Sequence, residues 1–227
     1  MDLLKNLTDV FIKYNYGLED ISFFIEDTIE SIEKEKINAS EDIFKEFTID
    51  LIKGKNSLFL KSVHIFIISY VEAFNREFFS ILRKNKEEFY RQVAGSIPRT
   101  NPTSIENYLQ NSLELEIRKE FPQWDDFCEN LVRRNKIVHN RSRIDKEYID
   151  LVENNIILKP EMEFGKEIPH DLNYITGLIT NCFHYFAYTF IKIMKYYFNY
   201  NEVRGYVRKT LRQYADVDPN FLDFYPY

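Results

Sequence analysis

Three polar residues near the end of a predicted helix have the types and spacing of a small catalytic group: Arg134, Asn135 and His139. Residues four apart share one face of a helix, so Asn135 could hydrogen-bond the His139 imidazole and set its orientation. Histidine suits proton transfer because its unperturbed pKa lies near ~6.5. A fixed guanidinium stabilises developing negative charge. The spacing alone is a weak signal, because many proteins carry an arginine and a histidine at this distance.

The helix expected over residues 123–140 gives this group a context. On a wheel of about 100° per residue, four large apolar residues fall on one stripe: Trp124, Phe127, Leu131 and Val138. Arg134 falls inside that stripe, and Arg133 points away from it, toward solvent. A guanidinium that faces a core is costly unless it is paired or has a function. The pattern therefore predicts an inward Arg134 at the edge of a buried surface.

The remaining elements are also expected to be helices. Glycine and proline are scarce, and apolar residues recur at helical spacing, which indicates an all-α fold. Breaks are expected at Gly17 and at Gly54 with Asn56, and Thr103 to Glu106 has the pattern of a capping box. The simplest core is a bundle of four helices, over 57–84, 103–120, 123–140 and 171–197. Shorter elements are expected over 2–15, from about 21 to 32, from Ser40, and over 146–153 and 201–214, with an irregular excursion at 156–169.

This reading divides the chain into a helical N-terminal layer (1–54), the bundle (55–200) and a C-terminal helix with a tail (201–227). Residues 172–191 carry no charge and are long enough to span a bilayer, but their many polar side chains favour a buried core helix. No membrane association is expected. Without a signal peptide at the start, and with only Cys128 and Cys182, both read as buried small hydrophobic residues, the expected location is cytoplasmic.

Charge is distributed unevenly along the chain. The formal net charge is −6, which argues against a protein that coats nucleic acid. A basic island nevertheless surrounds the candidate group, with only Asp145 expected to oppose it: Arg133, Arg134, Lys136, Arg141, Arg143 and Lys146. These cations could bind phosphates, or they could be a solvated helix end that the helix dipole favours. Both interpretations stay open.

The run Arg134-Asn135-Lys136-Ile137-Val138-His139-Asn140 resembles the catalytic motif of the HEPN superfamily of ribonucleases. An earlier helix with Tyr70-Val71-Glu72-Ala73-Phe74 and an apolar helix after the motif are also similar, so the resemblance covers about 57–197. It implies a HEPN-like helical bundle and a metal-independent endoribonuclease without cofactors. Arg134 and His139 would be catalytic, with Asn135 in support. The RNA 2′-hydroxyl would attack the adjacent phosphate and leave a 2′,3′-cyclic phosphate.

The resemblance also implies partners. One chain offers a single motif histidine, so a homodimer that places two motifs face to face would supply acid and base. RNA contacts are expected from Arg133, Lys136, Asn140, Arg141 and Arg143, although Asn140 could simply cap the helix. Such enzymes act as toxins or in anti-phage defence, with an antitoxin or other regulatory protein. Arg141 replaces a tyrosine that is frequent in antitoxin-paired members, which puts regulation at that tyrosine in doubt.

The sequence leaves two other functional hypotheses open. One is a non-catalytic HEPN-like module for dimerisation or partner binding, and the other is a structural helical protein with a chance motif. Glu72 either pairs with Arg134 and orients it, or pairs with Arg76 one turn on, the second being favoured. No metal-ligand spacing involves His64, His170 or His184, which are read as structural. No metal site is expected.

Overall fold

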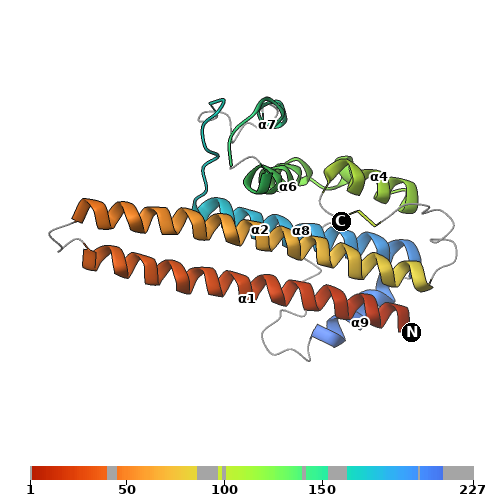
Figure 1. Cartoon of the computed structure of the whole chain (residues 1–227). Helices are drawn as coiled ribbons and strands as arrows, with labels where there is room; N and C mark the ends of the chain where they lie inside the picture. The colour runs from red at the N-terminus through yellow and green to blue at the C-terminus, as the bar shows by residue number, and fades with distance from the viewer. Residues whose placement is uncertain are drawn as a thin grey trace. The chain divides into compact units, whose positions relative to one another are not determined.

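The computed structural model describes residues 2–39, 45–85, 97–98, 101–139, 142–152, 163–198 and 200–211. Within these ranges the chain is helical, and the predicted all-α class is confirmed (Figure 1). An isolated bridge between Arg143 and Glu167 is the extent of β pairing in the described part. The helices are α1 (Asp2–Ala39), α2 (Lys45–Asn85), α4 (Pro102–Leu113), α5 (Ile117–Glu120), α6 (Trp124–His139), α7 (Lys146–Val152), α8 (Leu172–Tyr197) and α9 (Tyr200–Leu211).

The chain forms two compact units, each assembled from separate segments. Unit 1 comprises residues 1–15, 70–128 and 181–227, and unit 2 comprises 16–69 and 129–180. Helices α1, α2, α6 and α8 contribute residues to both units. The expected division into 1–54, 55–200 and 201–227 stays a prediction.

Two expected helix breaks are wrong. Helix α1 continues through Gly17, and α2 continues through Gly54 and Asn56. A glycine inside a helix costs only about 1 kcal/mol relative to alanine. Burial of the flanking apolar residues outweighs that cost, since Leu18 and Ile52 are almost completely buried. The expected breaks rested on the glycines alone, which are a local feature of the sequence. The packing that keeps both helices continuous depends on the tertiary structure.

A third boundary differs from its prediction at the start of α4. Asn101 rather than Thr103 is the N-cap, and its side chain accepts a hydrogen bond from the Ser104 backbone N–H at 2.9 Å. Pro102 then occupies the first turn, where no N–H is needed. The single helix expected over 103–120 is two helices, because Glu114 adopts a left-handed conformation (φ 55°) that ends α4.

The core of unit 1 is built from stacked aromatic rings. Phe127 stacks on Tyr185 with ring centroids 4.3 Å apart, and Phe11 stacks on Phe190 at 4.4 Å. The Tyr185 hydroxyl donates to Asn75 at 2.8 Å, so this buried polar group is satisfied. Cys128 and Cys182 are free and buried, as predicted.

One helical stretch meets the length and composition of a membrane span, namely Thr48–Lys84 within α2. Core helices of soluble proteins meet the same criterion. Ile67, Val71 and Phe74 of α2 are fully buried, and 39% of its most apolar window is buried inside the structure. The segment that the sequence singled out, 172–191, lies in α8. Its residues from Tyr185 to Ile191 are fully buried, as predicted for a core helix.

In unit 2, the segment that follows α6 forms backbone hydrogen bonds with the segment that precedes α8. Ile144 N–H donates to Lys166 O at 2.8 Å, and Ile168 N–H donates to Ser142 O at 2.7 Å. This pairing shields a small apolar cluster formed by Ile144, Tyr148, Val152 and Ile168. The described part of the expected excursion, 163–169, is thus partly extended and anchored.

The continuity of α2 through Gly54 gives a stability prediction. A Cβ at Gly54 would meet no atom within 4 Å, and its backbone is helical. Gly54→Ala is expected to stabilise the protein by about 1 kcal/mol, because alanine loses less backbone entropy on folding. Urea denaturation measures the change. Gly165→Ala is the matched control, because its φ of +80° strains any side chain and should lower stability. No gain at position 54 would contradict a continuous α2.

Candidate functional site

The two neighbouring arginines of α6 have opposite surroundings, and the orientation expected from the sequence is wrong. Arg133 is buried, with 1% of its surface exposed, whereas Arg134 is only partly buried. Val138, counted in the buried stripe, is 44% exposed. The expected orientation of α6 was wrong because it was assigned from the apolar residues alone. The buried side of this half of α6 also carries Glu129 and Asn130, each about 2% exposed.

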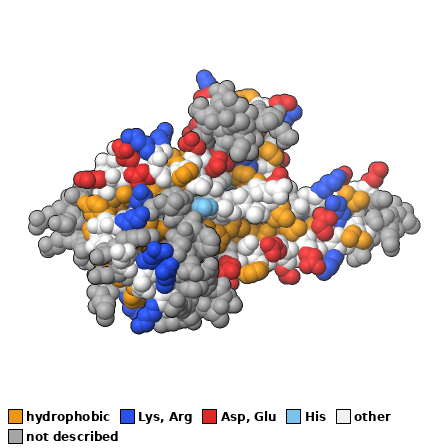
Figure 2. All heavy atoms as spheres, turned by 180° about the vertical axis from the view of Figure 1, so that it is seen from behind, with side chains coloured by type: hydrophobic (Ala, Val, Ile, Leu, Met, Phe, Trp, Pro, Cys, Tyr) orange, Lys and Arg blue, Asp and Glu red, His pale blue; other side chains and the backbone are white. Residues whose placement is uncertain are grey.

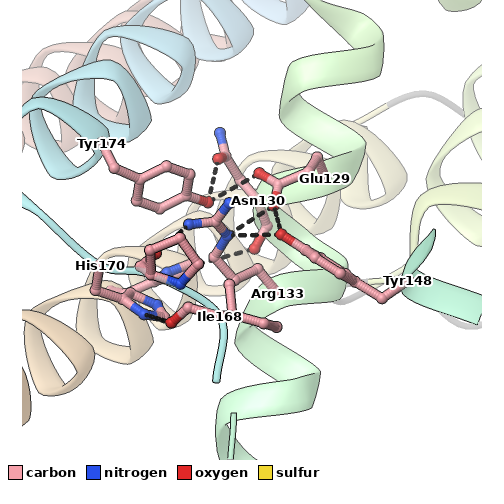
Figure 3. Close-up of polar contacts among 9 residues, drawn as sticks. Glu129, Asn130, Arg133, Tyr148, Ile168, His170 and Tyr174 are labelled. Carbon is pink, nitrogen blue, oxygen red and sulfur yellow. Dashed lines mark hydrogen bonds and ion pairs between the residues drawn. The ribbon is translucent and has the colours of Figure 1, made fainter. Parts of the chain in front are cut away.

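Arg133 is held by a set of polar and aromatic partners from three elements (Figure 3). Its Nε donates to Glu129 Oε1 at 2.6 Å and lies 3.0 Å from the Tyr148 hydroxyl of α7. Its Nη1 donates to the Pro169 carbonyl at 2.8 Å. The guanidinium carbon lies 3.6 Å from the ring centroid of Tyr174 in α8, a cation–π contact. These contacts join α6, α7 and the start of α8 around one buried charge.

Glu129 completes this buried network. It accepts hydrogen bonds from the Tyr148 hydroxyl and, at 3.0 Å, from the Tyr174 hydroxyl, which also lies 2.6 Å from Asn130 Oδ1. Burial, reinforced by the Glu129 charge, raises the pKa of both tyrosines, so both keep the protons they donate. Burial opposes the charged form of Arg133, but Tyr174 and Glu129 outweigh it and the pKa of Arg133 is raised. Arg133 therefore keeps its charge in the interior.

Two histidines border the same network. His64 Nε2 lies 2.9 Å from the Asn130 carbonyl oxygen, and His170 Nδ1 lies 3.0 Å from the Ile168 carbonyl oxygen. Burial lowers the pKa of His64 to about 3 and that of His170 to about 4, and the Arg133 charge adds to both shifts. Both rings are therefore neutral near pH 7. Within the described ranges, no group of three or more His, Cys, Asp or Glu side chains could hold a metal ion.

The predicted catalytic group lies on the last two turns of α6. Arg134 Nη1 donates to Asn135 Oδ1 at 3.0 Å, so Asn135 contacts the guanidinium rather than the imidazole that the sequence suggested. His139 is exposed at the end of the helix. Among the described residues, no carboxylate lies within ion-pair distance of Arg134. The Arg134 charge is thus oriented but not neutralised by a counter-ion in this part of the chain.

The basic island is smaller than expected. Lys136 is buried and pairs with Asp145 at 2.8 Å and also with Glu147, so the expectation that only Asp145 opposes these cations is wrong. Arg133 forms a buried ion pair with Glu129 and does not belong to the surface island. Arg143 and Lys146 are exposed. Two of the expected RNA contacts, Asn140 and Arg141, lie outside the described residues.

Glu72 has the partner that the sequence favoured. It accepts a hydrogen bond from Arg76 Nη2 at 3.0 Å, one turn along α2 in unit 1. Its structural interpretation, pairing with Arg76, is confirmed.

Comparisons of the chain with protein-family models, with curated proteins and with solved structures found no match. The fold and the site themselves define a protein, all-helical in its described part, in which one helix, α6, carries a buried arginine network and, on its last two turns, a partly buried Arg134 and Asn135 followed by an exposed His139.

The opposite surroundings of the two arginines predict opposite effects on stability. Arg133→Met is expected to lower the free energy of unfolding by about 3 kcal/mol or more, because it leaves Glu129 buried without its counter-charge. Arg134→Met should cost less than about 1 kcal/mol. Urea denaturation of both variants measures this difference. Adding Glu129→Gln to Arg133→Met should recover part of the loss. A larger loss for Arg134→Met would restore the orientation expected from the sequence.

Proposed function

We propose that the protein is a metal-independent endoribonuclease of the HEPN type, with Arg134 and His139 as its catalytic residues and Asn135 as the residue that positions Arg134. The observation that carries the proposal is the state of Arg134. A guanidinium held by Asn135, with no carboxylate partner in the described residues, stands on the turn before an exposed histidine. Such a charge is available to an anionic ligand, and phosphate geometry suits arginine.

The proposed reaction needs three functions at the scissile phosphate. A base removes the proton of the RNA 2′-hydroxyl, whose oxygen then attacks the adjacent phosphorus. An acid protonates the departing 5′-oxygen, so one fragment ends in a 2′,3′-cyclic phosphate and the other begins with a 5′-hydroxyl. Histidine can perform either proton transfer. Arg134 stabilises the extra negative charge of the pentacoordinate phosphorus through charge-assisted hydrogen bonds.

The surroundings of the cations restrict how RNA would be bound. Arg133 is buried and Lys136 is paired with two carboxylates, so neither is retained as an RNA contact. Arg143 is exposed and remains a candidate, together with Asn140 and Arg141. The proposed site therefore relies on a few cations close to the scissile phosphate rather than on a broad basic surface. This agrees with the acidic net charge of −6.

A second copy of the chain would complete the site. One chain contributes one motif histidine, whereas acid and base are both needed. His139 is exposed, and its neighbour Val138 exposes 44% of its surface at the same helix end. A two-fold contact at this end of α6 would bury Val138 and bring His139 and Arg134 together twice. In the cell such an enzyme would act as a toxin or a defence effector under the control of a regulatory protein. The alternative is a HEPN-like module that dimerises or binds a partner without cleaving RNA.

Cleavage is tested on a fluorescently labelled RNA in the presence of EDTA. The wild type should release fragments ending in 2′,3′-cyclic phosphate, and His139→Ala and Arg134→Ala should each lose at least about 100-fold in rate. Arg118→Ala is the matched control, because Arg118 pairs on the surface with Glu106 in unit 1 and should leave the rate unchanged. Intact RNA with the wild type, or equal rates for all variants, would refute the enzyme.

The composite site is tested by mixing chains. If one site needs His139 from both copies, adding inactive His139→Ala chains to a fixed amount of wild type should lower the activity per wild-type chain, because mixed dimers form. Light scattering should give the mass of a dimer for the active protein. Activity that stays proportional to wild-type chains, or an active monomer, would contradict the shared site.

A further inference from the structure

Unit 2 carries an open apolar groove far along the sequence from the α6 motif, between α1 and α2. Its volume is about 350 Å³, and its lining is Asp20, Ile21, Phe24, Phe59, Ser62, Val63 and Phe66. The helices run antiparallel here (Figure 1), and Glu35 of α1 pairs with Lys55 of α2 at 3.6 Å. Helix α2 contributes about two turns (59–66) and α1 just over one turn (20–24), so the groove is on the order of 10 Å long.

Two of the three aromatic side chains that line this groove expose more than half of their surface. Phe24 is 60% exposed and Phe66 is 56% exposed, and the ring centroids of Phe24 and Phe59 are 6.1 Å apart. Further large apolar residues of the same two helices are also exposed, including Phe23 at 63% and Leu58 at 68%. Single exposed apolar residues are ordinary, but a concave cluster of them is typical of an interaction site.

The α1 side of the groove is acidic. Asp20 belongs to the lining, and Asp27, one turn beyond Phe24, shares its side of α1. In the portion of the chain that the structure describes, neither carboxylate has a cation within ion-pair distance. From Glu19 to Glu35, α1 carries seven acidic residues and one lysine, Lys34, which pairs with Glu30 at 2.6 Å. Figure 2 shows hydrophobic side chains along this hairpin with acidic ones gathered on its α1 margin.

We propose that this groove binds a basic amphipathic helix of a partner protein. Two turns of such a helix match the length of the groove, with apolar side chains at helical spacing entering between Phe24, Phe59 and Phe66. Lysine or arginine on the flanks of the incoming helix would face Asp20 and Asp27. The acidic α1 side disfavours RNA and anionic lipid surfaces, which repel carboxylates. This inference is independent of the proposed nuclease activity, because no residue of the α6 motif takes part.

The test uses two synthetic fluorescent peptides of 15 residues with the same leucine stripe, one with lysines on the polar face and one with glutamates. Fluorescence anisotropy should show saturable binding of the lysine peptide and at least ten-fold weaker binding of the glutamate peptide. Phe24→Ser and Phe66→Ser should each weaken the lysine peptide at least ten-fold. Asp20→Lys with Asp27→Lys should also weaken it and should strengthen the glutamate peptide. A lysine peptide of the same composition with its leucines scattered should bind no better than the glutamate peptide.

Phe164→Ser is the matched control, since Phe164 is 73% exposed in unit 2 and does not line the groove. It should bind the lysine peptide as the wild type does, and thermal melts should show that all variants remain folded. Three results would overturn the proposal: equal binding of both peptides, a dimer that becomes monomeric with Phe24→Ser, or vesicle binding that Phe66→Ser abolishes. The second would assign the groove to another copy of the chain, and the third would assign it to a lipid surface.

Discussion

The ion pair between Arg133 and Glu129 is the constraint on which unit 2 depends. Two charges removed from water lose their hydration, and their mutual attraction compensates only when the remaining donors and acceptors are also satisfied. Tyr148 of α7, together with the Pro169 carbonyl and Tyr174 at the start of α8, supplies these partners, except that Arg133 Nη2 has no hydrogen-bond partner among the described residues and the guanidinium instead lies against the Tyr174 ring. The pair therefore fixes the segments that deliver these groups, and with them the rotation of α6 about its axis.

That rotation decides what the candidate site can do. Consecutive residues of a helix point about 100° apart, so the burial of Arg133 directs Arg134 to the boundary with solvent. There Asn135 holds the guanidinium, and His139 follows at the exposed helix end. The interior arginine is structural and the boundary arginine is available to a ligand.

Other buried titratable groups of unit 2 are likewise either neutral or paired with an opposite charge. His64 and His170 are kept neutral by burial beside Arg133, and Lys136 is matched by Asp145 and Glu147. Unit 2 thus combines a small cationic site on α6 with an acidic, aromatic surface on α1 and α2. The two surfaces suit ligands of opposite charge, so the proposed RNA site and the proposed partner site would not compete for the same molecule.

The sequence by itself determined the helical class, the positions of α6, α7 and α8 to within a few residues, and the grouping of Arg134, Asn135 and His139 on one helix. Scarce glycine and proline and the period of the apolar residues suffice for that, because these signals are local. Only the tertiary structure decided that α2 continues through Gly54 and that Arg133, not Arg134, faces inward. The decisive partners of Arg133 lie up to 41 residues away, at Tyr174, and a helical wheel that counts apolar residues cannot register a polar interior assembled from distant segments.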